Sequence, residues 1–165
     1  MSERVLAGLK PEKVFEYFEN ISAIPRGSGN TEQISSYCAA LAASKGLKYI
    51  KDGLGNVVIF KPASKGMESS EPVIIQGHLD MVCEKVHGST HDFKKEGLKL
   101  IVDGDFVHAD GTTLGGDDGI AVAMALALID SDDLKHPPLE VVLTVDEEAV
   151  SYTHLRAHET VLDLV

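Results

Sequence analysis

Histidine and carboxylate residues gather at three places in the sequence, and together they could bind a metal ion. Each group follows an apolar run or opens one. The residues are His78, Asp80, Asp117, Asp118, Glu147 and Glu148. Imidazole and carboxylate groups are ligands of Zn²⁺, Mn²⁺ and Co²⁺, so these residue types indicate a metal site. Acidic residues at strand ends can also be solvated turn residues, and spacing alone leaves both interpretations open.

The elements that must position these residues are two strands and a helix. The runs Val73–Ile75 and Leu139–Val145 are continuously apolar, which is typical of strands buried on both faces of a sheet. The run Ile120–Ile129 is apolar all round and rich in alanine, which predicts a buried helix. Open α/β sheets bind ligands at the carboxyl ends of their strands. We therefore expect the three acidic groups to converge on one site.

The rest of the chain reads as alternating helical and extended segments, which indicates an α/β sandwich. Helices are predicted over Pro11–Ile24 and from Asn30, as N-cap, to Gly46. Strands are predicted over Lys48–Lys51 and Asn56–Lys61, followed by a surface loop over residues 62–71. Asp103-Gly104 predicts a hairpin turn between Leu98–Val102 and Phe106–His108.

Composition limits the classes of partner. The chain has 165 residues, 44% of them hydrophobic, which fits one globular domain or a piece of one. Fifteen basic and 26 acidic residues give a formal charge of −11, which disfavours a nucleic-acid partner. We expect no membrane span and no secretory leader. Cys38 and Cys83 are far apart, which indicates reduced thiols and a cytoplasmic location.

Three ordered motifs resemble a known family. GHLDMV at residues 77–82, TTLGGDDGI at residues 112–120 and TVDEEA at residues 144–149 are similar to three successive N-terminal motifs of the aminoacyl-histidine dipeptidases. This family belongs to the dinuclear zinc peptidase and carboxypeptidase superfamily. Lys61-Pro62-Ala63 and His91-Asp92-Phe93 resemble the same family more than its tripeptidase relatives. The resemblance runs from about residue 10 to Ala149.

The resemblance implies a zinc-peptidase-like three-layer sandwich, in which helices cover a mixed sheet. Residues 1–149 would be the N-terminal part of the metallopeptidase catalytic domain. Residues 150–165 do not resemble the family and read as an unrelated tail, of the kind obtained when a sequencing adapter is translated. Relatives are much longer and take two more metal ligands from downstream segments. The resemblance therefore implies an incomplete catalytic unit, inactive by itself.

Roles carry over position by position. His78 matches a metal ligand, and Asp80 matches the carboxylate that anchors its second ring nitrogen. Asp117 matches the aspartate that bridges two metal ions. Glu147 matches the general base that takes a proton from the attacking water, and Glu148 matches a terminal metal ligand. A buried histidine satisfied by a backbone carbonyl is the structural alternative for His78.

The implied activity is hydrolysis of Xaa-His and other unblocked dipeptides. The implied cofactor is Zn²⁺, two ions per site in the longer parent, with Mn²⁺ or Co²⁺ also suited to these ligands. The parent would be a homodimer. The family pattern also implies a cis peptide between Asp117 and Asp118. Alternatives are a tripeptide aminopeptidase, an N-acyl amino acid hydrolase of the same superfamily, or a fragment without catalytic function.

Overall fold

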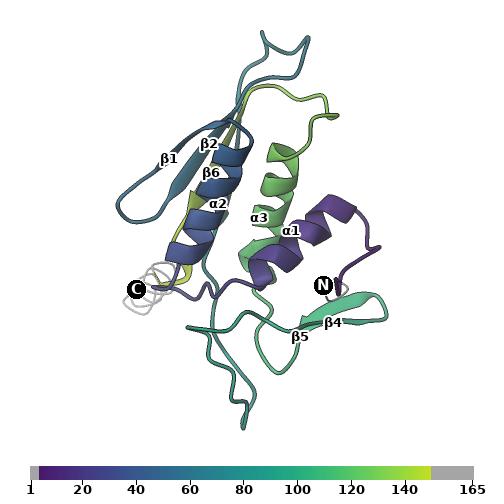
Figure 1. The fold of residues 1–165 in the computed structure, drawn as a ribbon, viewed down its shortest axis with the longest axis vertical. Coiled ribbons are helices and arrows are strands. Elements are labelled where there is room, and N and C mark those ends of the chain that lie inside the picture. The colour runs from purple at the N-terminus through teal and green to yellow at the C-terminus, as the bar shows by residue number, and fades with distance from the viewer. Residues whose placement is uncertain (1–3, 150–165) are drawn as a thin grey trace, which may run out of the picture.

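A four-stranded sheet forms the centre of the structure, and three helices lie over one of its faces (Figure 1). The computed structural model describes residues 4–149. The helices are α1 (Glu12–Ser22), α2 (Glu32–Ser44) and α3 (Gly116–Ile129). The sheet contains β1 (Lys48–Lys51), β2 (Val57–Lys61), β3 (Val73–His78) and β6 (Leu139–Thr144). A separate hairpin consists of β4 (Leu100–Asp103) and β5 (Phe106–Ala109).

The sheet is mixed, with the strand order β1-β2-β6-β3. β2 runs antiparallel to both β1 and β6, whereas β3 runs parallel to β6. The carboxyl ends of β3 and β6 therefore meet at the same end of the sheet, where His78 is paired with Thr144. This register brings the segments that follow the two strands together, as the sequence pattern predicted.

The core lies between the helices and one face of the sheet. Strand register aligns Ile59 with Val141, and Val141 with Ile75, on that face. Ile59 and Val141 are fully buried. The helices contribute Phe18, Ile21, Ile34, Cys38, Val122 and Leu126 to the same cluster. Each large aliphatic or aromatic side chain buried there stabilises the fold by about 1.5–3 kcal/mol.

The ammonium group of Lys61 caps the carboxyl end of α3. Its side chain is buried, and its Nζ atom donates to the carbonyl oxygens of Leu128 and Ile129 at 2.8 and 2.9 Å, and also to that of Ser131. The last carbonyls of a helix lack partners within the helix, so a buried ammonium group is well suited to them. Lys61 thereby joins β2 to the carboxyl end of α3.

The expectation that β3 is buried on both faces is wrong. Val73 is 46% exposed and Ile74 is 66% exposed. Within residues 4–149, β3 is an edge strand and the described helices cover only the other face. β6 shows the same asymmetry, because Leu139, Val141 and Leu143 are buried while the residues between them are half-buried. The α/β class and the mixed, helix-covered sheet are confirmed, and the described residues supply two layers.

Most element boundaries differ from expectation by one to three residues. The N-cap of α2 is Thr31 rather than Asn30, and it forms no side-chain capping bond. α3 begins at Gly116, before the predicted apolar run, and Asp117 and Asp118 within it have non-helical dihedrals. The predicted hairpin around Asp103-Gly104 forms as β4 and β5.

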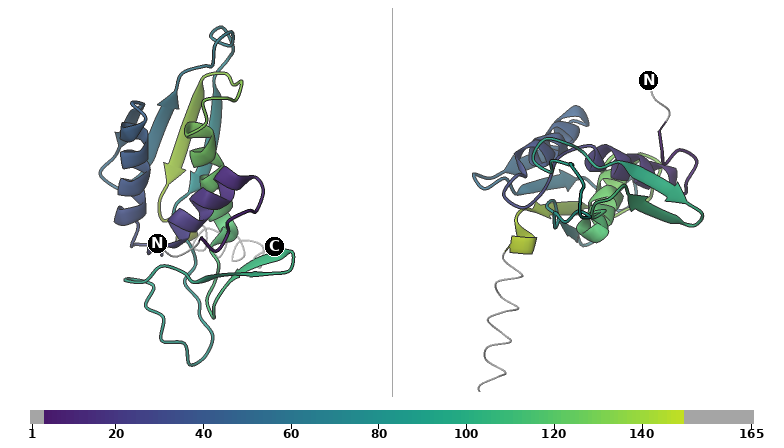
Figure 2. Two further views of the ribbon diagram at one scale, coloured as in Figure 1. Left: turned by 45° about the vertical axis from the view of Figure 1, so that its right-hand side comes forward. Right: turned by 90° about the horizontal axis from the view of Figure 1, so that it is seen from below.

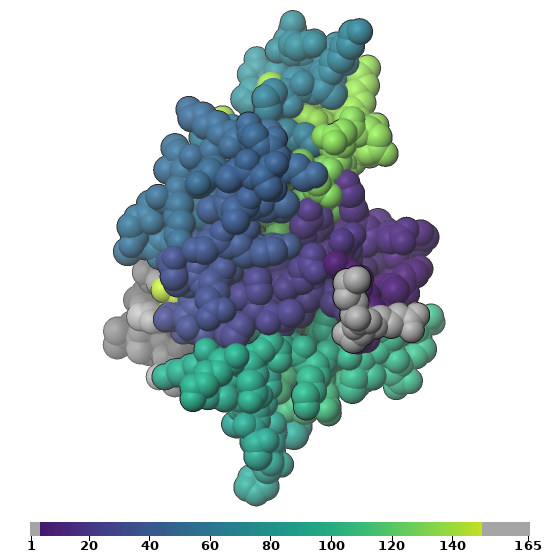
Figure 3. Space-filling model, viewed as in Figure 1, coloured from purple at the N-terminus to yellow at the C-terminus, as the bar shows by residue number. Residues whose placement is uncertain are grey.

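Long connections lie at both ends of the sheet (Figures 2 and 3). Residues 62–72 form one, and the segment from residue 79 through the β4–β5 hairpin forms the other. Within residues 4–149, no helix combines the length and apolarity needed to cross a bilayer. The predicted tail, residues 150–165, lies outside the described residues.

Candidate metal centre

The carboxyl ends of β3 and β6 and the start of α3 bring three possible metal ligands together. One ligand atom each of His78, Asp117 and Glu148 lies within 4.8 Å of the others. His78 is buried, Glu148 is half-buried and Asp117 is exposed. The predicted convergence of the three acidic groups is therefore observed for these residues. A cluster open to solvent on one side can admit an ion and a water molecule.

Both nitrogens of the His78 imidazole have partners. Nε2 lies 3.2 Å from Oδ1 of Asp117 and 3.9 Å from Oε2 of Glu147. Nδ1 lies 3.2 Å from the backbone oxygen of Asp80 and 3.4 Å from its Oδ1 atom. A proton on Nδ1 would satisfy these oxygens and leave the lone pair of Nε2 facing the carboxylates. The carbonyl contact expected of a structural histidine is present, and it supports the ligand geometry too.

Asp80 is fully buried and organises the segment after β6. Its Oδ1 atom accepts the backbone N–H of Glu147 at 3.0 Å, and its Oδ2 atom accepts that of Glu148 at 3.2 Å. Oδ2 also accepts the hydroxyl of Ser28 at 2.7 Å. Residues 147–149 are helical, so the carboxylate meets the free N–H groups of a first turn. Asp80 thus links the orientation of His78 to that of the two glutamates.

The non-helical first residues of α3 present Asp117. Gly115 has a left-handed conformation, with φ of 63°, and the Asp117–Asp118 peptide is cis, as the family pattern implied. The Asp117 side chain is 86% exposed, while Oδ2 of Asp118 accepts the backbone N–H of His78 at 3.3 Å. The two neighbouring aspartates therefore face different partners, and Asp118 ties α3 to β3.

Electrostatic coupling at the centre favours a positive charge. Burial is the largest single influence on the pKa of His78 and lowers it. The hydrogen bond to Asp117 and the negative charges of Asp80, Asp118 and Glu147 outweigh burial, so this pKa is raised. Carboxylates that stabilise an imidazolium stabilise a bound cation in the same way.

The pKa of Glu148 is shifted by the same group of charges. Burial raises the pKa of its carboxyl group, and the charges of Asp117, Glu147 and Asp80 raise it further against the opposing effect of His78. Like charges held close together disfavour ionisation, and a bound cation removes that cost. The cluster is thus suited to exchange protons for a metal ion.

Three further residues support the site and escaped the sequence pattern. Arg26 is buried, and its guanidinium donates to the backbone oxygens of Leu79 and Asp80. Ser28 binds Asp80, and the Oδ1 atom of Asp146 accepts the N–H of Gly29 at 2.6 Å. Arg26, Ser28 and Gly29 lie in the loop between α1 and α2, which has no apolar period and no ligand spacing. Their only signal is a lone arginine among glycine and proline.

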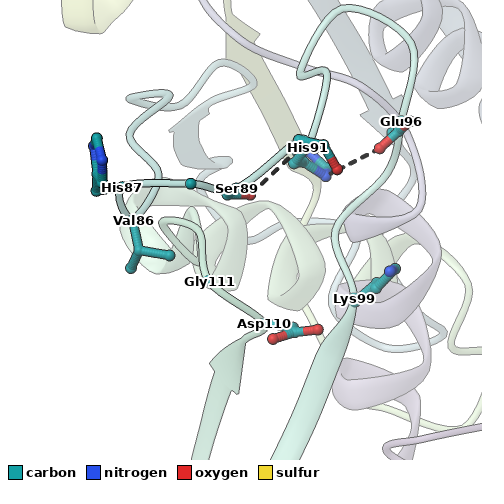
Figure 4. Close-up of a pocket in the computed structure, with 10 residues that line it drawn as sticks. Val86, His87, Ser89, His91, Glu96, Lys99, Asp110 and Gly111 are labelled. Atoms are coloured by element: carbon teal, nitrogen blue, oxygen red, sulfur yellow. Dashed lines mark hydrogen bonds and ion pairs between the residues drawn. The ribbon is translucent and has the colours of Figure 1, made fainter.

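Two cavities lie near this end of the sheet. A cavity of about 350 Å³ adjoins Glu148 and is lined by Ser28, Met81, Val82, Cys83 and Ala149. A second, polar cavity of about 440 Å³ is lined by residues 86–91, Glu96, Lys99, Asp110 and Gly111 (Figure 4). In it, Nδ1 of His91 lies 3.4 Å from Oε2 of Glu96. None of the clustered ligands lines the second cavity, so it is distinct from the metal centre.

No protein-family model matches the chain. The chain is 44% identical over 149 residues to the cytosol non-specific dipeptidase of Escherichia coli strain K12. This match covers 90% of the chain and 30% of the relative. The chain thus spans about three tenths of the length of that relative.

Solved structures give a consistent result. The aminoacylhistidine dipeptidase of Vibrio alginolyticus matches with a TM-score of 0.85 and 41% identity, over 90% of this chain and 30% of that one. A tripeptidase of Staphylococcus aureus matches with a TM-score of 0.65 and 21% identity, over 83% of this chain and 37% of that one. The second likeness shows a shared fold only. By sequence and by structure, the chain is homologous to one part of the cytosol non-specific and aminoacylhistidine dipeptidases.

Proposed function

We propose that the protein containing this chain is a metal-dependent hydrolase of unblocked dipeptides, including Xaa-His. The observation that carries the proposal is the convergence of His78, Asp117 and Glu148 at the carboxyl ends of two parallel strands. The names of the two dipeptidase homologues supply the substrate class. The name of the Escherichia coli relative supports a cytosolic location, and we propose a homodimer for the parent.

The residues fit a divalent metal ion. One imidazole nitrogen and two carboxylates form a donor set accepted by Zn²⁺, Mn²⁺ and Co²⁺. Asp80 stands behind His78, where a metal-binding imidazole needs an acceptor for its second nitrogen. In the parent, His78, Asp117 and Glu148 would hold Zn²⁺, for which we propose two ions per site, and further ligands would come from residues beyond those described.

The mechanism assigns separate tasks to the side chains. When bound, the ions supply Lewis acidity, which polarises a peptide carbonyl and lowers the pKa of a water molecule. Glu147 lies beside the cluster, with its side chain 43% exposed, where it can accept the proton of the attacking water. Asp80 fixes the backbone of Glu147 and Glu148, so that the base and a ligand keep one spacing.

Substitution of Glu147 tests this function. In the full-length parent, Glu147→Gln is expected to lower kcat by about 10²–10⁴-fold because general-base catalysis is lost. Metal content, measured by atomic emission, stays unchanged because Glu147 is not a ligand. Glu140→Gln, on β6 away from the cluster, is the matched control. Full activity of the Glu147→Gln enzyme would contradict the assignment of the base.

A substrate panel separates the alternatives. Dipeptides, tripeptides and N-acetyl amino acids are compared at equal concentration with the same enzyme. Highest kcat/KM for dipeptides supports the proposal, and highest kcat/KM for tripeptides or N-acetyl amino acids supports the alternative hydrolases. Equilibrium dialysis of the 165-residue chain against Zn²⁺ then shows whether the three described ligands bind an ion without the rest of the parent.

A further inference from the structure

Arg26 joins two segments that carry proposed metal ligands. Its Nη1 atom donates to the backbone oxygens of Leu79 and Asp80, at 3.1 and 3.3 Å, in the segment that follows His78. Its Nη2 atom donates to the backbone oxygen of Gly115, two residues before Asp117. One planar group therefore spans the end of β3 and the start of α3.

The glycines of the α3 turn make room for this guanidinium. A Cβ atom at Gly115 would lie 2.5 Å from Nη2 of Arg26, and one at Gly119 would lie 2.6 Å from the same atom. Neither distance is sterically allowed, so side chains are excluded at both positions while Arg26 stays in place. The turn that presents Asp117 is thus built around Arg26.

Burial of the Arg26 side chain is unfavourable in free energy, because it removes a charged group from water. It is 2% exposed, and its Nε atom has no hydrogen-bond partner among the described residues. Burial lowers the pKa of Arg26 to about 10, against the raising effects of Asp80 and Asp118, so the group stays charged at neutral pH. Within residues 4–149, Arg26 donates to three backbone carbonyl oxygens. An apolar side chain at position 26 would leave these oxygens unpaired.

We infer that Arg26 is a positioning residue of the metal centre, which holds His78 and Asp117 at ligand spacing through its fork of hydrogen bonds. The inference rests on the proposed function, since it concerns the same site. The three carbonyl groups lie one to two residues from those ligands, so a shift of either segment moves a ligand directly. Residues that orient metal ligands typically change metal affinity by about 10–100-fold when removed.

The direction in which metal affinity changes when Arg26 is replaced separates three possible roles of this residue. A buried positive charge near a cation site opposes binding of the cation, so removal of a purely electrostatic Arg26 would tighten binding. Removal of a purely structural Arg26 would lower thermal stability and leave affinity unchanged. Removal of a positioning Arg26 weakens binding, although a repelling charge is lost.

The test measures Co²⁺ binding to the 165-residue chain. Calorimetry gives the affinity, and visible absorption reports the geometry around the bound ion. Arg26→Met keeps the length of the side chain and removes the donors, and Arg26→Lys keeps the charge and removes the fork. Both are expected to weaken Co²⁺ binding by about 10-fold or more and to change the absorption spectrum. Arg4→Met, at an exposed arginine paired with Glu16, is the control and is expected to leave both unchanged.

Each outcome decides the inference. Unchanged or tighter binding by a folded Arg26→Met chain contradicts it, and so does a normal affinity in Arg26→Lys. If circular dichroism shows that neither variant folds, Arg26 serves folding rather than ligand spacing, and the inference is wrong. Absence of Co²⁺ binding by the unsubstituted chain shows that the three ligands hold no ion without the rest of the parent; this overturns the inference for this chain, whereas the proposed function is tested separately by the activity of the parent.

Discussion

Asp80 accepts the backbone N–H of Glu147 at 3.0 Å through the same Oδ1 atom that lies 3.4 Å from Nδ1 of His78. One buried oxygen therefore sets both the proposed metal ligand on β3 and the proposed base after β6. The two side chains come from segments far apart in the sequence, which the parallel pairing of β3 and β6 brings side by side. Their relative position depends on Asp80 as much as on the sheet.

Asp80→Asn tests this dependence. The amide nitrogen of the new side chain would face a donor from the backbone, which leaves buried polar groups unpaired at a cost of about 1–3 kcal/mol. We expect the free energy of unfolding to fall by that amount and Zn²⁺ affinity to fall about 10–100-fold. Urea unfolding and isothermal titration calorimetry measure the two effects. Asp133→Asn, at an exposed position, should change neither.

Lys61→Met tests how much the hydrogen bonds of Lys61 at the carboxyl end of α3 stabilise the fold. The substitution keeps the aliphatic stem but removes the ammonium group from three carbonyl oxygens. We expect a loss of about 1–3 kcal/mol in the free energy of unfolding, because those acceptors stay buried. Chemical denaturation gives the value, with exposed Lys65→Met as the control. Equal stability of the two variants would show that the Lys61 contacts contribute nothing.

Acid sensitivity is expected at Asp130, after α3. Burial raises its pKa, but hydrogen bonds and ion pairs with Lys45 and Lys13 outweigh burial, so the pKa lies below its usual value of 3.8. Because the folded-state pKa is depressed, the stabilisation is complete above the unfolded-state pKa and is lost as the pH falls through the folded-state pKa. Asp130→Asn should therefore destabilise the chain by about 0.5–1 kcal/mol at pH 7.

The pH dependence of this difference is the check. Thermal unfolding of the native chain and of Asp130→Asn is compared from pH 7 down to a pH below 3.8, the usual pKa of an aspartate side chain. The difference in stability should shrink as Asp130 becomes protonated in the native chain. A difference that stays constant across this range would exclude a contribution from the charge of Asp130.

The two cysteines should differ in reactivity. Cys38 is fully buried in the core, and burial raises the pKa of its thiol to about 12. Cys83 is half-buried and lines the cavity beside Glu148. Ellman's reagent should modify Cys83 alone in the folded chain and both thiols after unfolding. Modification of both thiols in the folded chain would contradict the packing of α2.

Residue types and strand ends predicted that the acidic groups meet, and the family resemblance supplied the roles proposed for them. His78 and Glu148 follow apolar runs, and parallel strands must end together, so their meeting required no knowledge of the helices. Periodicity could not show which face of β3 the helices cover, and so Ile74 was wrongly expected to be buried. Arg26 carried no periodic signal, because its role depends on backbone oxygens that are 53 and 89 positions away. Such contacts exist only in three dimensions.

The absence of room for a Cβ atom at Gly115 and Gly119 has a consequence for sequence variation. Positions 26 and 119 share one volume, so their residues should covary among homologues, whereas position 115 is also confined to glycine by its left-handed φ of 63° and by Sδ of Met81, 2.7 Å from the place of a Cβ atom. A side chain larger than hydrogen at position 119 should occur only where position 26 carries a shorter residue than arginine. Where arginine is kept at position 26, glycine should be invariant at both turn positions, whichever substrate the enzyme prefers.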